Sequence, residues 1–518
     1  MELTTATLLL ISLPLILLSS LLLGRKSKAA RPPGPWSLPF IGSLHHLLTP
    51  LPHVALRDLA KKHGPVMYLR LGQVDAVVIS SPAAAQEVLR DKDLSFASRP
   101  SILASEICLY GNLDVAFAPY GAYWRTMRRL CTTELLSARK VRQFAPVRGG
   151  EIMRLVETVR SAGRGGEPVN LGGLVMACTN TVTAKVAFGE GCAGELQAQF
   201  LSAIEVILRS SGGLCVGDLF PSLSFVDVVS GMKRRLWRAR RQLDTVLDKI
   251  IAECEERREQ NKTGDDEDLL RVLLRVRDEG QLEVPMGTTN IKAVIADMFA
   301  GGTETTASTT EWVMSELIRN PSAMAKAQKE VRCAFNHKNP EDHEAHMEEL
   351  CYTKMVVKEA MRLHPVVPLL LPRVCRETCD VRGLRVEEGT RVFVNAWAMA
   401  RSPEYWQDAE EFRPERFEDN AADYKGTQLE YLPFGSGRRM CPGNIFALAL
   451  VELVVARLLY YFDWSLPAGM RPDELDMNTV VGLTAKRSNQ LLLVVSPYNV
   501  PIHKEIDECK AHWCSLVV

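Results

Sequence analysis

One cysteine lies in a setting that favours chemistry. Residues 434–443 are Phe-Gly-Ser-Gly-Arg-Arg-Met-Cys-Pro-Gly, so Cys441 falls in a glycine-rich turn. The apolar run Ile445–Leu459 follows and predicts a helix. Backbone N–H groups and the positive end of a helix dipole both favour thiolate over thiol. A thiolate here can bind a soft metal centre or act as a nucleophile, with Arg439 as a nearby positive charge and Phe434 covering the sulfur's apolar side.

Two further patterns are suited to ligand binding and proton transfer. Trp124 and Arg128 lie four residues apart on one face of a predicted basic helix, where an indole N–H and a guanidinium can grip a carboxylate. Alone, such a pair is more often a packing contact. The segment 300–306, Ala-Gly-Gly-Thr-Glu-Thr-Thr, weakens one long helix predicted over Asn290–Ile318. Its two glycines cost about 1 kcal/mol each relative to alanine, and its threonines can bend the helix by bonding to backbone carbonyls.

The elements around these residues follow from hydrophobic pattern and turn residues. A strand pair is predicted at Val66–Leu71 and Ala76–Ile79, around Gly72. A helix is predicted at Pro82–Arg90, with Ser81 as its cap and Pro82 in its first turn. A longer charged helix is predicted at Leu236–Arg258, followed by a polar loop at Asn261–Asp268.

The cysteine segment resembles a known family. Its pattern Phe-x-x-Gly-x-Arg-x-Cys-x-Gly matches the haem-binding signature of the cytochrome P450 family at every fixed position. The resemblance implies a single-domain cytochrome P450 fold, mainly α with a small β region, with Cys441 as the axial thiolate ligand of the iron of haem b. Such a thiolate pushes electron density through iron and favours O–O cleavage. The residues implied in cofactor binding are Trp124, Arg128, Arg373, Arg439, Phe434 and Gly435.

The same resemblance implies roles for two more groups of residues. Glu304 and Thr305 match the acid–alcohol pair of the family's oxygen-binding groove, where a carboxylic acid beside a hydroxyl relays protons to bound dioxygen. Glu359, Arg362 and Arg416 match a buried charged network that holds the core together. They are interpreted as structural, because removing one member leaves a buried charge unpaired, at about 3–5 kcal/mol. His364 is also interpreted as structural, since the sulfur already fills the axial site.

Composition sets limits on the function. The chain has 518 residues, 47% hydrophobic content and zero net charge, from 62 Lys and Arg against 62 Asp and Glu. That balance argues against nucleic-acid binding as the main function. The 13 cysteines are scattered without paired spacing, which fits a reducing compartment. No Walker pattern occurs, and the Gly-x-Gly-x-x-Gly spacing at 189–194 follows no predicted strand, so no phosphate-binding motif is identified. We therefore expect electrons from a partner, which the resemblance identifies as NADPH-cytochrome P450 reductase.

The N-terminal residues predict a membrane anchor. Leu3–Leu23 is almost entirely apolar, and roughly 20 such residues span a bilayer core. Basic residues follow this segment rather than precede it, which favours an uncleaved anchor over a signal peptide and places the rest of the chain in the cytosol. We expect a single-pass protein of the endoplasmic reticulum membrane. The predicted parts are an anchor at 1–24, a basic and proline-rich hinge at 25–36, a haem-thiolate domain at 37–500 and a tail at 501–518.

The resemblance also narrows the substrate. Stretches at 55–60 and 116–124 resemble the 9β-pimara-7,15-diene oxidases of grasses, which implies a pimaradiene-type diterpene in phytoalexin biosynthesis. By family position, the pocket should be lined by mostly aliphatic or small residues, which suits an apolar terpenoid; these are Ser101–Tyr110, Val294–Thr305, Val366–Leu370 and Val481–Thr484. The alternatives are a sesquiterpene or phenolic monooxygenase, and a reductase-independent isomerase or dehydratase, against which Thr305 and the cysteine-loop spacing argue.

Overall fold

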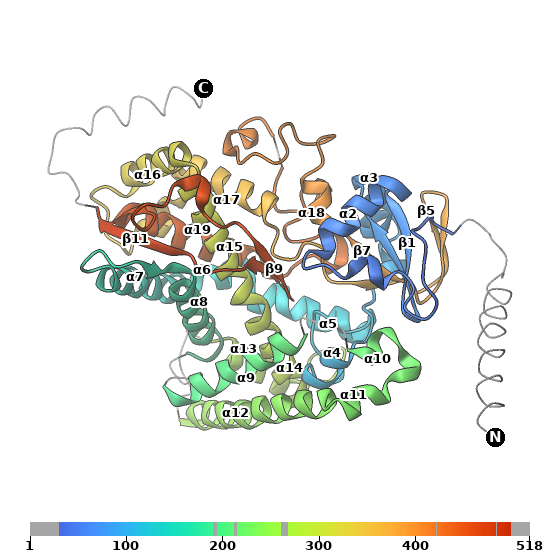
Figure 1. The fold of residues 1–518 in the computed structure, drawn as a ribbon. Coiled ribbons are helices and arrows are strands. Elements are labelled where there is room, and N and C mark those ends of the chain that lie inside the picture. The colour runs from blue at the N-terminus through green and yellow to red at the C-terminus, as the bar shows by residue number, and fades with distance from the viewer. Residues whose placement is uncertain are drawn as a thin grey trace, which may run out of the picture.

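The structure is a computed structural model that describes residues 31–189, 194–211, 215–260, 268–420, 422–482 and 484–498. The predicted anchor at 1–24, most of the predicted loop at 261–268 and the predicted tail at 501–518 lie outside the described residues. Helices fill most of the molecule, and a four-stranded sheet lies at one side of it, next to α2 and α3 (Figure 1). Helix α12 runs along one edge, and α15 passes through the middle.

The longer helices build the main body. They are α2 (Pro52–His63), α5 (Ala122–Leu130), α7 (Ala145–Ala162), α8 (Leu171–Phe188), α9 (Glu195–Ser211), α12 (Met232–Gln260), α13 (Leu269–Glu279), α14 (Thr288–Gly302), α15 (Glu304–Arg319), α16 (Pro321–Phe335), α17 (Cys351–Leu363) and α19 (Asn444–Tyr461). The short helices are α3 (Pro82–Gln86), α4 (Leu103–Cys108), α6 (Ala138–Gln143), α10 (Val216–Leu219), α11 (Phe225–Val229) and α18 (Ala396–Ala400).

The strands form four small sheets. The largest has the order β1 (Val66–Leu71), β2 (Val74–Ile79), β7 (Arg391–Val394) and β4 (Arg373–Val374), with β2 and β7 parallel and the other pairs antiparallel. In β1 and β2, Leu69 pairs with Ala76, and the turn between them passes through Gly72 at φ 63°. The others are the hairpins β5 (Cys379–Val381)–β6 (Leu384–Val386) and β9 (Thr479–Val481)–β10 (Ala485–Arg487), and a sheet of β3 (Val169–Asn170), β11 (Leu492–Pro497) and β8 (Phe462–Ser465).

Several local predictions are confirmed. The predicted strand pair is β1 and β2, and the helix predicted after the cysteine is α19. Ser81 caps α3, because its Oγ accepts a hydrogen bond from the Ala84 N–H at 3.3 Å. The helix predicted over Pro82–Arg90 is α3 followed by a π-helical turn at Glu87–Asp91. The prediction of one long helix over Asn290–Ile318 is wrong, because the structure divides it at Thr303 into α14 and α15.

Two threonine hydroxyls explain the division of that helix. Thr303 Oγ1 donates to the Phe299 carbonyl at 2.9 Å, and Thr305 Oγ1 donates to the Gly301 carbonyl at 2.5 Å. These carbonyls lie four residues earlier, so the hydroxyls compete with the helix's own N–H donors for them. Because Gly301 and Gly302 lower the local helix propensity, the helix breaks where both effects meet.

Helices α8 and α19 pass through the hydrophobic core. Both are long and apolar enough to span a membrane by length and composition, but 56% of the α8 segment and 61% of the α19 segment are buried inside the protein. Helix α19 is apolar on nearly all sides, with Leu450, Val454 and Leu458 fully buried. These properties are those of core helices. Helix α19 packs against α15 and α16, and so fixes the chain that follows Cys441 relative to the α14–α15 break.

Candidate active site

The loop before α19 holds Cys441 through its own backbone. The Cys441 N–H donates to the Phe434 carbonyl at 2.9 Å, which closes the loop. Gly435 and Gly437 have φ of 71° and 72°, a conformation that L side chains rarely adopt. At Gly437 a Cβ would also lie 2.0 Å from the Leu89 carbonyl oxygen. These glycines therefore permit the tight path that brings the sulfur to the start of α19.

Burial governs the charge of the Cys441 sulfur. Desolvation raises the pKa of this thiol, while the Gly443 N–H and the positive charge of Arg128 act in the opposite direction and do not overcome it. Burial therefore opposes ionisation of this thiol, while the helix start and Arg128 favour it. The physical reason is that removing a sulfur anion from water costs more than one N–H and one guanidinium return. A directly bound metal cation deprotonates a coordinating thiol outright.

A small hollow lies beside this loop. It is walled by α15, the end of α17, the cysteine loop and α19, with Phe434 in the wall and Thr305 at its edge. Most of the lining is apolar; the lining residues are Thr305, Thr306, Thr309, Met361, His364, Pro365, Val366, Pro433, Phe434, Ala447 and Val451. Such a lining suits a flat apolar group.

Four arginines gather around the same loop, and we call Arg99, Arg128, Arg373 and Arg439 the guanidinium cluster. Arg439 donates to the carbonyls of Ala97, Val115 and Ala118, at 2.6, 3.2 and 2.5 Å. Arg99 donates to the carbonyls of Ala116, Leu371 and Pro372. Arg373 donates to Asp93 at 2.8 Å and to the Ser436 carbonyl at 3.0 Å. Within the described ranges, Asp93 is the one carboxylate that forms an ion pair with any member of the cluster.

Positive charge is therefore in excess at this position. Burial, followed by repulsion from Arg373, lowers the pKa of Arg439 to about 9 and the pKa of Arg99 well below its ordinary value. Burial also lowers the pKa of Arg128, which the Cys441 sulfur partly offsets. In the part of the chain that the structure describes, no hydrogen bond or ion pair is recorded for the Arg128 side chain. An anionic ligand would relieve this excess charge.

Trp124 supports the guanidinium cluster. Its indole N–H donates to the Val115 carbonyl at 2.9 Å, and its ring lies 4.2 Å from the Arg439 guanidinium carbon. Trp124 and Arg128 both come from α5, as the sequence predicts. The indole N–H is thus already engaged by the backbone in this structure, and Trp124 positions Arg439 by a cation–π contact.

Glu304 and Thr305 begin α15, at the break in the long helix. Glu304 accepts from Lys486 Nζ at 2.7 Å, a contact between β10 and α15. The Thr305 hydroxyl donates to the Gly301 carbonyl, and Thr305 also lines the hollow. The acid and the alcohol are therefore consecutive at the start of α15, and the alcohol lines the hollow. Sequence reasoning missed the lysine that is bonded to the acid.

The structure brings Glu359, Arg362 and Arg416 together, and we call them the Glu359 network. Arg362 donates to both oxygens of Glu359, at 2.7 and 2.9 Å, and Arg416 Nε donates to Glu359 Oε1 at 2.8 Å. The side chains of Glu359 and Arg362 are fully buried. The remaining guanidinium N–H groups of Arg362 and Arg416 are directed at backbone carbonyls, among them those of Ala400 and Ala409.

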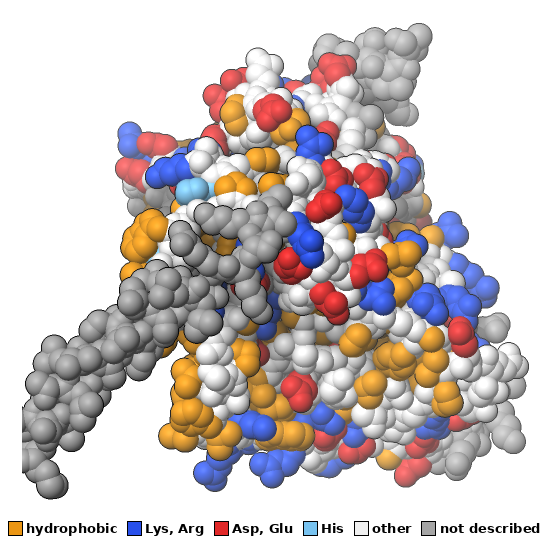
Figure 2. Space-filling model, turned by 90° about the vertical axis from the view of Figure 1, so that its right-hand side faces the viewer, with side chains coloured by type: hydrophobic (Ala, Val, Ile, Leu, Met, Phe, Trp, Pro, Cys, Tyr) orange, Lys and Arg blue, Asp and Glu red, His pale blue; other side chains and the backbone are white. Residues whose placement is uncertain are grey.

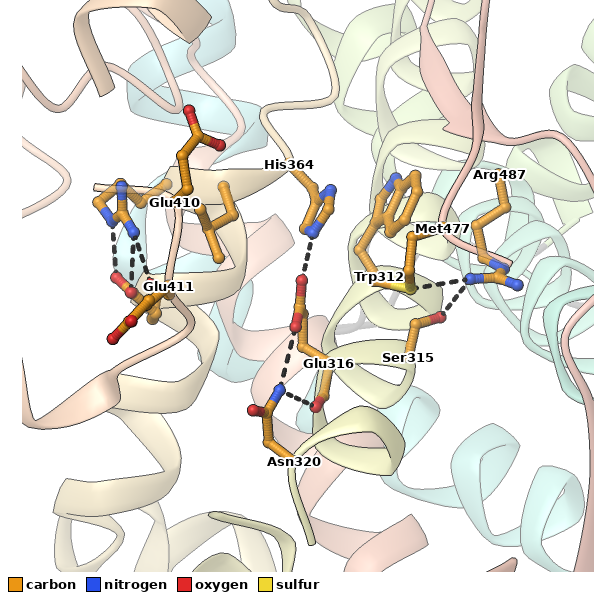
Figure 3. Close-up of polar contacts among 12 residues, drawn as sticks. Trp312, Ser315, Glu316, Asn320, His364, Glu410, Glu411, Met477 and Arg487 are labelled. Atoms are coloured by element: carbon orange, nitrogen blue, oxygen red, sulfur yellow. Dashed lines mark hydrogen bonds and ion pairs between the residues drawn. The ribbon is translucent and has the colours of Figure 1, made fainter. Parts of the chain in front are cut away.

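A second buried acid–base pair lies behind the hollow. His364 Nε2 and Glu316 Oε1 are 2.6 Å apart, and Asn320 donates to the other Glu316 oxygen at 3.2 Å (Figure 3). The His364 ring stacks on the Trp312 indole at 4.0 Å with 3° between the planes. His364 therefore contacts Glu316 and Trp312, which agrees with its interpretation as a packing residue of the wall.

Comparisons with known proteins agree with this geometry. The family model described as Cytochrome P450 matches residues 32–493. The chain belongs to the cytochrome P450 family. It is 62% identical over 505 residues to rice cytochrome P450 99A2, covering 96% of this chain and 94% of the relative. It is 61% identical over 497 residues to rice 9-beta-pimara-7,15-diene oxidase, covering 96% of this chain and 97% of the relative.

A solved cytochrome P450 has the same fold. A zebrafish cytochrome P450 with progesterone matches with a TM-score of 0.72 and 24% identity, over 86% of this chain and 99% of that chain. The protein is therefore an oxidoreductase of the monooxygenase type, with one mostly helical domain and small sheets. Cytochromes P450 bind haem iron through a cysteine thiolate.

The residues present fit haem. Haem carries a flat apolar ring, an iron that takes a thiolate ligand, and two anionic propionates. The apolar hollow, the Cys441 sulfur and the unneutralised guanidinium cluster are complementary to these three parts. Among the described residues, no group of three or more His, Cys, Asp and Glu side chains forms a separate metal site.

Sequence reasoning missed several residues of this site. Asp93 pairs with Arg373 across 280 positions, and Lys486 pairs with Glu304 across 182. Arg99, in the short segment between Phe96 and α4, had no signal except its charge. Asp297, inside the predicted apolar helix, was an unusual acid in the expected pocket wall, and that is a signal which could have identified it.

Proposed function

We propose that this cytochrome P450 oxidises an apolar terpenoid, and specifically a pimaradiene-type diterpene in phytoalexin biosynthesis. The observation that carries the proposal is the 61% identity, along 96% of the chain, to a rice enzyme named 9-beta-pimara-7,15-diene oxidase. The aliphatic residues of the pocket stretches support it, because a rigid hydrocarbon gains affinity from apolar contact area. The reaction class is hydroxylation or successive oxidation of one substrate.

Each residue of the site has a role in this proposal. The Cys441 sulfur would hold the iron of haem b, with Phe434 in the wall of the hollow and Gly435 next to it in the loop. Arg128, Arg373 and Arg439 hold the propionates, and Trp124 orients Arg439. Bound haem supplies oxygen activation. Glu304 takes up protons from solvent on the Lys486 side, and Thr305 passes them toward the hollow through its hydroxyl. The Glu359 network holds α17 to the following segment.

The electrons come from a partner in this proposal. An NADPH-cytochrome P450 reductase would donate them on the side of the Cys441 loop. Arg129 and Arg438 are exposed there, and the Arg438 side chain is 46% exposed. Two exposed guanidinium groups on the thiolate side suit an acidic protein face. Replacing both with glutamine should weaken reductase coupling, measured as cytochrome P450 reduction rate at low salt.

A membrane of the endoplasmic reticulum is the proposed location, with the predicted segment 1–24 as a single-pass anchor and the rest cytosolic. An apolar surface patch supports membrane contact; it comprises Trp36, Phe40, Ile41, Leu223, Phe225, Val228 and Val229, with Phe40 81% and Val229 82% exposed. Both parts of the patch adjoin the β1–β2 turn, since Gly72 donates to Ile41 and Gln73 donates to Leu219. Figure 2 shows hydrophobic side chains gathered on this side of the molecule, with Lys and Arg at their border.

Product analysis tests the proposal. The full chain is co-expressed with a plant reductase and given a panel of diterpene, sesquiterpene and phenolic precursors, and products are identified by mass spectrometry. Oxygenated pimaradiene, formed only with NADPH, is the expected result. Conversion of a sesquiterpene or phenolic in its place would overturn the diterpene assignment, and NADPH-independent rearrangement would indicate an isomerase. A Thr305→Ala variant serves as the matched control for proton delivery.

A further inference from the structure

The acid of the proposed proton route has a partner on a neighbouring strand. Glu304, the first residue of α15, accepts a hydrogen bond from Lys486 Nζ at 2.7 Å, and Lys486 belongs to β10. The Lys486 side chain is 47% exposed, whereas the Glu304 side chain is 15% exposed. The lysine is therefore the solvent-facing member of the pair, and the carboxylate lies largely covered at the start of α15.

Strand β10 is attached to α15 on both sides of Lys486. The Trp312 indole N–H donates to the Ala485 carbonyl at 3.5 Å, and Arg487 donates to Ser315 Oγ at 3.1 Å (Figure 3). Ala485 and Arg487 are buried and Lys486 between them is exposed, because successive side chains of a strand point to opposite sides. The attached strand therefore holds the Lys486 ammonium at one position relative to α15.

The two cations of β10 differ in how firmly they are held. Arg487 is buried, and its guanidinium also contacts Met477 Sδ at 3.6 Å and Glu311 Oε1 at 3.9 Å. Among the described residues, Glu304 is the one side chain recorded in a hydrogen bond or ion pair with Lys486. A half-exposed ion pair of this kind is weak in water, so it can open without disturbing the strand. Arg487 is thus an anchor, whereas Lys486 is free to leave its partner.

The hydroxyl that follows the acid belongs to the hollow. Thr305 lines the hollow beside the Cys441 loop, whereas Glu304 is not among the lining residues. Thr305 Oγ1 donates its proton to the Gly301 carbonyl, so the lone pairs of this oxygen can accept a hydrogen bond from an acid or from a water. In this structure the acid is therefore paired with the lysine, and a proton that it takes up must still reach the alcohol.

We infer that Lys486 is a positioning residue for proton uptake, which holds the Glu304 carboxylate toward solvent until the carboxylate takes up a proton. Protonation removes the negative charge on which the ion pair depends, so uptake itself releases the acid from the lysine. The proton then passes from Glu304 to Thr305 Oγ1, directly or through one water, and the regenerated carboxylate binds Lys486 again. The inference rests on the proposed proton route through Glu304 and Thr305, to which it adds the residue that separates uptake from delivery.

The alternative is an ion pair that only attaches β10 to α15. The contacts of Ala485 and Arg487 already provide this attachment on either side of Lys486, so an exposed pair adds little to it. If the pair were only structural, replacing Lys486 would change stability slightly and would leave proton delivery as it is. The two alternatives therefore differ in measurements that depend on protons.

Three variants separate these alternatives. Lys486→Met removes the ammonium and keeps a similar chain length. Lys486→Arg keeps a cation that can bond to the carboxylate, so it should restore what Lys486→Met loses. Glu304→Gln removes the proton carrier itself, and its combination with Lys486→Met shows whether the lysine acts through Glu304.

The first readout measures the fate of reduced oxygen when reductase and NADPH are supplied without a terpenoid. Dioxygen takes four electrons and four protons to become water, but two of each to become hydrogen peroxide. The share of consumed oxygen that becomes water therefore reports proton delivery, and it follows from the amounts of NADPH, oxygen and peroxide. In Lys486→Met this share should fall about fivefold, the factor that an exposed ion pair represents. The solvent isotope effect on water formation should increase, and Lys486→Arg should restore both values.

The second readout needs no activity. A water-soluble carbodiimide joins a carboxylate to an amine in contact through an amide bond and is itself converted to a urea. Mass spectrometry of peptides from the haem-free and haem-loaded full chain should show a Glu304–Lys486 link in the wild-type chain. Lys486→Arg should lack it, because a guanidinium stays protonated. The pair Lys354–Glu348, at 2.9 Å, should link in both chains and is the control.

Each contrary result has a distinct meaning. An unchanged share of water in Lys486→Met would overturn the inference, and so would a loss that persists in the Glu304→Gln background, because the lysine would then act elsewhere. Absence of the Glu304–Lys486 link, with the control pair linked, would refute the contact. If Glu304→Gln itself forms as much water as the wild-type chain, the proposed proton route is wrong and the inference fails with it. Neither readout uses a terpenoid, so a wrong substrate assignment leaves these results unchanged.

Discussion

Two buried charged regions of this protein differ in how their charges are neutralised. In the Glu359 network, the chain itself supplies both signs, and each guanidinium N–H group that the structure records finds a carboxylate or carbonyl oxygen. In the guanidinium cluster, four arginines share one paired carboxylate, Asp93, within the described residues. The charges of the Glu359 network are therefore neutralised without a ligand. The second has the charge pattern of a binding site, and the contrast separates a structural ion network from a cofactor site without using sequence similarity.

The largest expected effect comes from removing the sulfur. Cys441→Ala should abolish the thiolate type of reduced-carbonyl difference spectrum and all product formation, because no other side chain of the cysteine loop can act as a thiolate. Cys441→Ser is the matched variant, with an oxygen in place of the sulfur. An unchanged carbonyl spectrum in Cys441→Ala would refute the ligand assignment.

A change in the Glu359 network should destabilise the protein whether or not haem is bound. Glu359→Gln leaves Arg362 fully buried without its carboxylate, so we expect a loss of about 3–5 kcal/mol in the free energy of unfolding. Urea denaturation of the haem-free and haem-loaded chains measures it. The exposed pair Arg471–Asp473 provides the control, and Asp473→Asn should change stability by less than about 1 kcal/mol. Equal losses of stability in Glu359→Gln and Asp473→Asn would contradict the difference between a buried ion network and an exposed ion pair.

Proton delivery should fail without loss of the fold. Thr305→Ala removes a hydroxyl that lines the hollow, and we expect product formation to fall about 10²-fold. Haem content and the carbonyl spectrum should stay normal, and oxygen should still be consumed without matching product. Thr309→Ala, one turn farther along α15, is the control with its hydroxyl bonded to the Thr305 carbonyl. Undiminished product formation by Thr305→Ala would contradict the role of Thr305 in proton delivery.

The smallest expected effect concerns a buried base outside both regions, His343. His343 is fully buried, stacks on Phe335 at 4.0 Å, and has a pKa that burial lowers from 6.5 to about 4, with the Arg457 charge acting in the same direction. The folded state thus favours the neutral ring, so stability is present above about pH 6.5 and is lost as pH falls toward 4. His343→Phe should reduce this loss between about pH 7 and about pH 5 by about 2 kcal/mol, measured by denaturation at each pH. If His343→Phe loses as much stability between pH 7 and pH 5 as the wild-type chain, His343 is not the source of that loss.

The parts that the sequence predicted correctly are local. The cysteine loop, α19, the β1–β2 pair and the Ser81 cap depend on residues only a few positions apart, where glycine, proline and hydrophobic period act directly. The contacts that sequence reasoning missed are distant. Three contacts join positions 181 to 280 apart, and no local rule specifies them: Asp93 with Arg373, Lys486 with Glu304, and Asp297 with the N–H groups of Val115 and Ala116.

One local expectation was wrong, and one local cost was not visible, for physical reasons that only packing reveals. The chain from 290 to 318 forms two helices because Thr303 and Thr305 both use carbonyls of the preceding turn beside two glycines. Burial raises the pKa of the Cys441 thiol, a cost that its place before a helix does not reveal. Exposure of a given side chain is a tertiary property, so neither result follows from residue order.

We expect the two carboxylates of haem to neutralise the guanidinium cluster. The most direct measurement compares the affinity of the haem-free chain for haem and for haem dimethyl ester, in which both propionates are neutral. The account predicts that the ester binds about 10²-fold more weakly, as expected for the loss of charge-assisted hydrogen bonds, and that the difference shrinks in Arg128→Gln and Arg439→Gln. Equal affinity for the two compounds in the wild-type chain would contradict it.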